Sequence, residues 1–215
     1  MPADPPAATL TVGITGHRPN KLPNALVPRL ERQLRDVMAT IARAQSGKRV
    51  RMISGFAEGA DQIAVAAAPA SWTVEAILPF PTSEYLKDFE RSAAGDGRDA
   101  RGELLASLAR AAAVTELPIP PGSREDGYLA AGRAMLAQID LLIAVWDGQE
   151  PKSGGTGQIV REACDSGIPV VWLSTGADRQ PVLIERFADG APVASSRAWT
   201  AALSLLPRPT RAGPA

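Results

Sequence analysis

The sequence predicts a doubly wound α/β fold, in which a mostly parallel β-sheet carries helices on both faces. Two observations support this prediction. Short apolar runs, such as LLIAVW at 141–146, lack alternation and are typical of strands buried on both faces. Between these runs lie segments with apolar residues at helical spacing, as expected for right-handed crossovers between parallel strands.

Residues 139–171 contain the clearest strand–helix–strand unit. In order it comprises a strand at 141–146, the loop DGQEPKSGGTG at 147–157, a helix at 158–165 that stops at Gly167, and a strand at 169–173. In open parallel sheets the ligand crevice lies outside the carboxyl ends of the strands. The unit therefore predicts a binding site at residues 147–157.

The remaining chain alternates in the same way. Further strands are expected at 10–14, 50–53, 73–78 and 114–117, and helices at about 25–44, 60–68, 83–89, 103–112, 126–138 and 196–206. Beyond Thr175 the periodicity weakens, and GADRQP and DGAP are expected to be loops. We predict a single domain over 9–206 with five or six strands, flanked by loose tails at 1–8 and 207–215.

Composition narrows the class of protein. Lys+Arg and Asp+Glu are both 23 in a chain of 215 residues, so we expect nucleic acid not to be a partner. A single cysteine, Cys164, excludes an intramolecular disulfide, and with His17 as the only histidine no metal site is expected. The chain has no signal-peptide pattern and no apolar run of about 20 residues. We expect a cytoplasmic protein without a membrane partner.

Three loops that follow predicted strands carry small, polar or acidic residues. Because carboxyl ends of parallel strands share one edge, these loops can converge, although turns contain the same residue types. The candidate ligand-binding residues in the three loops are Thr15, Gly16, His17, Arg18, Ser54, Gly55, Glu58, Asp61, Asp147, Gly148, Gly154, Gly155 and Thr156. Pro79, after the strand at 73–78, and Arg133, on the helix before 141, complete the set.

The chemistry of these residue types predicts a phosphate site. Glycines 154 and 155, with Thr156, would let the backbone and the following helix N-terminus approach an anion. Asp61 would not attract phosphate, and it either caps its helix or accepts ribose hydroxyls. His17 is either a ligand contact or a hydrogen-bonding residue of its loop, and Arg18 is either a ligand contact or a solvated charge.

The motifs GITGHRP, SGFAEGAD, LPFP followed by Glu84-Tyr85, and AVWDG with GGTG resemble the SLOG superfamily over about residues 11–173. That superfamily is named for the DNA-processing protein of natural transformation and the cytokinin-activating LOG enzymes. The resemblance implies a Rossmann-like nucleotide-binding domain, often dimeric, whose members bind nucleotide-derived ligands or cleave nucleoside monophosphates. We therefore expect a homodimer that binds a nucleotide-like small molecule, with no required cofactor; an NAD-related compound is one candidate ligand.

The sequence departs from the LOG enzymes at a catalytic position. Their motif PGGxGTxxE places a glutamate three residues after the threonine, whereas here that position holds Ile159, or Arg161 if counted from Gln158. Arg133 could take the place of the arginine that LOG enzymes carry on the preceding helix. Glu162 lies one position after Arg161 and therefore does not match the motif. A ligand-binding or sensing domain is therefore the first hypothesis, and a LOG-like phosphoribohydrolase the alternative. Whether the protein is an enzyme stays open.

Overall fold

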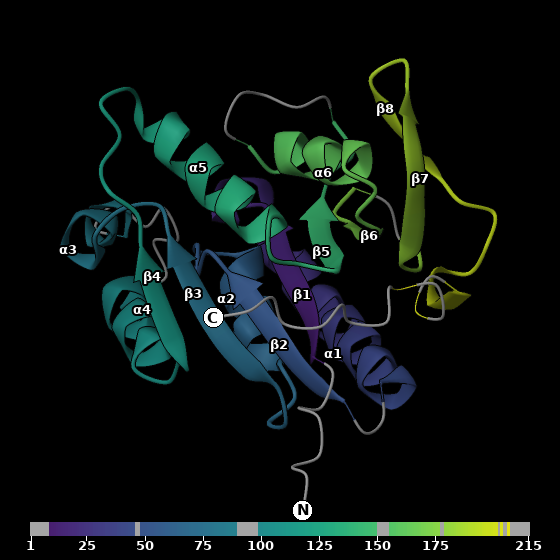
Figure 1. Ribbon diagram of the computed structural model, residues 1–215, viewed down its shortest axis with the longest axis horizontal. Coiled ribbons are helices and arrows are strands. Elements are labelled where there is room, and N and C mark those ends of the chain that lie inside the picture. Colours follow the sequence, from purple (N-terminus) through teal and green to yellow (C-terminus); the bar gives the residue numbers. More distant parts are fainter. Residues whose placement is uncertain are drawn as a thin grey trace, which may run out of the picture.

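A computed structural model describes residues 9–45, 48–89, 99–149, 155–176 and 179–201, with residues 203 and 206. Its strands are β1 (Thr9–Gly16), β2 (Arg49–Ser54), β3 (Thr73–Leu78), β4 (Ala113–Glu116), β5 (Leu141–Trp146), β6 (Val170–Ser174), β7 (Val182–Ala188) and β8 (Ala191–Ala194). They form one sheet in the order β4-β3-β2-β1-β5-β6-β7-β8 (Figure 1). The pairs from β4 to β6 are parallel, which confirms the predicted Rossmann-like α/β class.

Helices cover both faces of the sheet (Figure 1). They are α1 (Val27–Ala44), α2 (Ala60–Ala67), α3 (Thr82–Tyr85), α4 (Ala100–Leu108), α5 (Arg124–Leu136) and α6 (Thr156–Asp165), with 3-10 turns at η1 (Pro19–Lys21), η2 (Asn24–Leu26), η3 (Leu86–Asp88) and η4 (Trp199–Ala201). Helices α1 and α2 pack on one face, and α5 and α6 pack on the other. No helix in the described ranges is long and apolar enough to cross a membrane.

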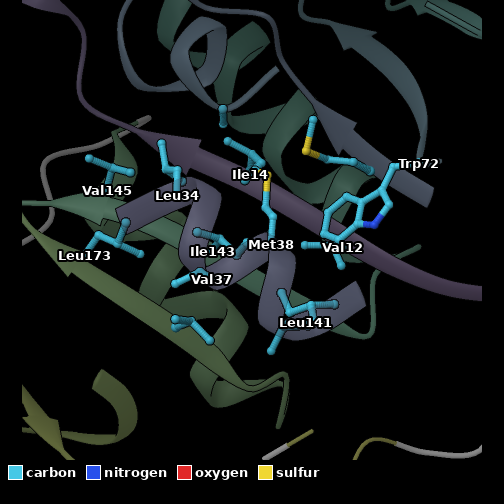
Figure 2. Close-up of a cluster of buried hydrophobic side chains, with 14 of the residues drawn as sticks. Val12, Ile14, Leu34, Val37, Met38, Trp72, Leu141, Ile143, Val145 and Leu173 are labelled. Carbon is cyan, nitrogen blue, oxygen red and sulfur yellow. The ribbon is translucent and has the colours of Figure 1, made fainter. Parts of the chain in front are cut away.

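The central strand β5 explains why its sequence is apolar without alternation. Leu141, Ile143 and Val145 join the core beneath α1 and α2, where Figure 2 shows them with residues of β1 and α1. The intervening residues, Leu142, Ala144 and Trp146, join the core beneath α5 and α6. All six side chains are buried.

The prediction of five or six strands is wrong, because a hairpin follows β6, and the loop predicted at DGAP is a turn only at Asp189-Gly190. β7 pairs antiparallel with β6, and β8 pairs antiparallel with β7. Only Ile184 of β7 is buried, so the strand lacks the apolar run that marks the central strands. The turn between β7 and β8 is Asp189-Gly190, with φ of 48° and 80°, a dipeptide typical of tight hairpins.

The predictions for the two chain ends fall largely outside the residues that the structure describes. The expected tails at 1–8 and 207–215 lie outside the described residues. Of the helix expected at 196–206, the structure describes a 3-10 turn at Trp199–Ala201, whereas several of the following residues lie outside the described ranges.

Candidate functional site

A cavity of about 330 Å³ lies where the strand order reverses. The chain runs outward from β1 to β4 in one direction and from β5 to β8 in the other, so β1 and β5 flank the switch point. This is where ligands bind in open α/β sheets. The cavity is bounded by the carboxyl ends of β1, β3 and β5, by the loop after β2, and by α5 and the start of α6.

The structure brings the three predicted loops together around this cavity. From the β1 loop, Thr15, Gly16, His17 and Arg18 line it. From the other elements, Gly55, Asp61, Pro79, Gly155 and Thr156 line it. These residues are scattered over 142 positions of the chain, from 15 to 156, and meet because their strands are parallel.

The loop SGFAEGAD is held in shape by its own polar groups. The hydroxyl of Ser54 donates to Asp61 Oδ2 at 2.9 Å and accepts from the Phe56 N–H at 3.0 Å. Asp61 also accepts from backbone N–H groups of the loop. Burial raises the pKa of the Asp61 carboxyl to about 6. Asp61 therefore organises this loop and presents the cavity with a carboxyl group that titrates near neutrality.

Gly59 joins this loop to the β1 loop. Its φ of 99° lies in the region that favours glycine, and a Cβ there would stand 2.6 Å from the His17 carbonyl oxygen. That carbonyl accepts the Ala60 N–H at 3.1 Å, and the His17 N–H donates to the Val145 carbonyl at 3.0 Å. The His17 backbone thus ties α2 to β5 at the edge of the cavity.

The His17 side chain also bonds within the loops. Its Nε2 accepts the Asp147 N–H at 3.2 Å and lies 3.1 Å from Asp147 Oδ1. Burial lowers the pKa of His17, which favours the neutral ring that this acceptor role requires. The Asp147 carboxylate also lies 3.5 Å from Lys21 Nζ and accepts the Gln149 N–H at 3.0 Å.

Arg18 belongs to a charged network on the cavity wall. Its guanidinium lies 4.9 Å from the centre of the Tyr128 ring, and its Nη2 lies 3.6 Å from Asp88 Oδ2. Asp88 accepts hydrogen bonds from the Tyr128 hydroxyl and from Arg124 Nη2, the latter at 2.7 Å. Arg124 Nη1 also donates to Glu84 at 2.6 Å.

The first turn of α6 faces the cavity with backbone donors. The helix begins at Thr156, two residues before the predicted start, with Gly155 as its N-cap and no acidic residue in its first turn. The first N–H groups of a helix have no intrahelical acceptor, and Gly155, Thr156 and Gly157 all line the cavity. With Arg18 and Lys21 on the wall, this end of the cavity is suited to an anion.

Several predicted residues lie elsewhere. Ser54, Glu58, Asp147 and Gly148 are absent from the cavity lining in the described part of the chain, and Gly154 falls outside that part. Gly148 has a φ of 82° and packs against Trp172, which is a structural role. Arg133 is 58% exposed and pairs with Glu162, with its Nε 2.9 Å and its Nη2 2.8 Å from the two carboxylate oxygens.

Other cavity residues were not predicted from the sequence. They are chiefly Lys21, Tyr85, Tyr128 and Met135. Tyr85 follows the LPFP motif and donates its hydroxyl to the Gly55 carbonyl at 3.1 Å. Tyr128 and Met135 lie seven residues apart on α5, the spacing of one helical face, which is a signal that could have identified them.

No family model and no curated protein matches the chain. One solved structure to which it is similar is DNA processing protein A from Helicobacter pylori, at 18% identity and a TM-score of 0.47, covering 92% of this chain and 73% of that chain. That structure is described as showing a single-stranded DNA binding mode. Our expectation that nucleic acid is not a partner is corrected, because equal totals of charge do not describe how the charges are distributed.

Proposed function

We propose that this chain is a SLOG-like domain that binds a nucleotide or nucleotide-derived small molecule in the cavity beside β1 and β5, as a binding or sensing module. One observation carries the proposal. The N-terminus of α6, without an acidic residue in its first turn, opens into a cavity at the switch point of the sheet.

The distribution of charge and apolar surface supports a phosphorylated ligand that carries a ring. Arg18, Lys21 and the start of α6 all line the cavity and supply cationic groups and backbone donors. Ile14, Ile77 and Met135 supply apolar parts of the same lining. A site of this kind, apolar with a few convergent polar groups, is typical for small-molecule ligands.

The arrangement of carboxylates favours binding over cleavage of a glycosidic bond. The position of the LOG glutamate holds Ile159 if counted from Thr156, and Ile159 lines the cavity. Counted from Gln158 it holds Arg161, which is not among the described lining residues. Glu162 is paired with Arg133 and, like Arg133, is absent from the lining as far as the chain is described. Among the described lining residues the one carboxylate is Asp61, which accepts hydrogen bonds from its own loop.

The test removes one backbone donor from the start of α6. Proline is well tolerated at the first helical position, and the ψ of 171° at Gly155 suits a following proline. Thr156→Pro therefore deletes an N–H with little cost in folding, and Thr156→Ala deletes the hydroxyl but keeps the N–H. We expect Thr156→Pro to weaken the best phosphorylated ligand by about tenfold or more, and Thr156→Ala by less.

The measurement is calorimetric titration with nucleoside phosphates, sugar phosphates, dinucleotides and a short single-stranded oligonucleotide. Chromatography of each mixture after long incubation reports any release of free base, which would favour the hydrolase alternative. A panel in which no ligand binds would refute the proposed function. Equal affinity of Thr156→Pro and the parent would place the anion away from α6.

A further inference from the structure

We infer that Asp88, which lies outside the cavity, positions Arg18 for the anionic group of the ligand by fixing Tyr128. This inference rests on the proposed function, because it concerns the same cavity. Asp88 lies in η3, and it joins the segment after β3 to the β1 loop and to α5.

The contacts of Asp88 show how the positioning works. Its carboxylate is largely buried and accepts from both the Tyr128 hydroxyl and Arg124, so two donors fix its orientation. Its distance to Arg18 is 3.6 Å, longer than a hydrogen bond. The attraction between Asp88 and Arg18 is therefore that of an ion pair. The guanidinium also bonds the Tyr128 side chain, and its further N–H groups are donors for another acceptor.

Tyr128 is the surface on which Arg18 rests. The guanidinium carbon lies 4.9 Å from the ring centroid, within the range of a cation–π contact. The ring is held from two sides, since its hydroxyl bonds Asp88 and its edge packs on Phe80 at a centroid distance of 5.5 Å. Arg18 and Tyr128 both line the cavity. Asp88 thus positions Arg18 by holding the Tyr128 ring.

A purely structural role for Asp88 makes a different prediction. Arg124 bridges Asp88 and Glu84, and this clamp fastens η3 and α3 to α5. If the clamp were the whole role, loss of either acidic partner would have similar effects on every ligand. In the described residues Glu84 pairs with Arg124 and Lys87, whereas Asp88 is the acidic partner of Arg18 and Tyr128, which makes Glu84→Gln the matched control for Asp88→Asn.

The experiment measures discrimination between AMP and adenosine by calorimetric titration, since the two differ by the phosphate alone. Asp88→Asn and Tyr128→Phe should each lower the affinity for AMP by about tenfold and change that for adenosine by less than about twofold. Glu84→Gln should leave the ratio of the two affinities unchanged. In an Arg18→Gln background, Asp88→Asn should have no further effect on the ratio.

The outcomes separate the two proposals. A parent protein that binds AMP no more tightly than adenosine overturns the anion site and, with it, the role of Asp88. A parent that discriminates, together with Asp88→Asn and Tyr128→Phe variants that discriminate as well or better, overturns the role of Asp88 alone. Equal losses in Asp88→Asn and Glu84→Gln would assign Asp88 to the clamp. Tyr128→Phe keeps the ring, so it tests the inference even if Asp88→Asn folds poorly.

Discussion

At the scale of single residues, buried polar side chains shape the loops that form the cavity. Ser54 and Asp61 bond one another inside the loop after β2, and His17 accepts the N–H of Asp147 across the switch point. A buried polar group without a partner is costly, so these pairs specify one loop conformation. The same burial moves the pKa of Asp61 upward and that of His17 downward.

Asp61 should make stability depend on pH in a defined direction. Its pKa is raised from 3.8 to about 6, so the folded protein binds this proton more tightly than the unfolded chain does. The contribution of Asp61 to the unfolding free energy is therefore largest below about pH 4 and decreases as the pH rises to 6. Asp61→Asn removes the titration, so the stability of this variant relative to the parent should improve by about 2–3 kcal/mol between pH 4 and 7.5.

Urea unfolding of both proteins across this pH range gives the difference directly, and the titration of His17 cancels because both proteins contain it. A difference for Asp61→Asn that is independent of pH would contradict the assignment.

At the scale of elements, α6 and α2 each begin directly after a glycine at the cavity. Gly155 is the N-cap of α6, and any residue can adopt its φ of −95°. α2 begins after Gly59, whose φ of 99° and ψ of −124° are open to glycine almost alone. The two positions should therefore respond differently to substitution, because the backbone at Gly155 accepts any residue whereas the backbone at Gly59 does not.

Gly59→Ala should destabilise the fold by about 2–4 kcal/mol, since backbone strain is added to a Cβ placed 2.6 Å from the His17 carbonyl oxygen. Gly176→Ala is the control, because a Cβ there meets no atom within 4 Å and its φ is not in the positive range. Its effect should be below about 0.5 kcal/mol. Urea midpoints measure both variants. Equal stability of Gly59→Ala and the parent would show that the loop can adopt another conformation.

At the scale of the whole molecule, β5 is a central strand that contributes to both cores. Its alternate residues enter the two apolar layers, and on either side it pairs in parallel with β1 and β6. The carboxyl ends of β1 and β5 form the base of the cavity, so the same strand carries stability and positions the site. Damage to β5 should affect both.

Ile143→Ala should lower the unfolding free energy by about 2–5 kcal/mol, because Ile143 is fully buried and the substitution leaves a cavity in the core. Ile119→Ala makes the same chemical change at a side chain that is 59% exposed, and it should cost less than about 0.5 kcal/mol. Chemical denaturation with the two variants side by side tests this. Similar losses in both would mean that β5 is not the centre of the core.

The sequence by itself determined the fold class and the edge of the sheet where the cavity lies. Strands at 73–78 and 141–146 were predicted with the bounds that the structure shows. A strand buried on both faces must be apolar throughout, and the loop after it must contain small or polar residues. Both patterns can therefore be recognised in the local sequence. Parallel pairing then brings distant loops together, which requires no knowledge of side-chain contacts.

The tertiary structure alone decided which side chains reach the cavity and which partners hold them. β7 pairs with β6 on one side and with β8 on the other, so backbone hydrogen bonds hold this hairpin although its sequence has little apolar character. Arg133 turns to Glu162 on the outer surface, which helical spacing could not resolve. Asp88 meets Arg124 and Tyr128 across 36 and 40 residues of chain, because the segment after β3 packs on α5. Such contacts follow from how elements pack together, and packing depends on the shape of the whole molecule.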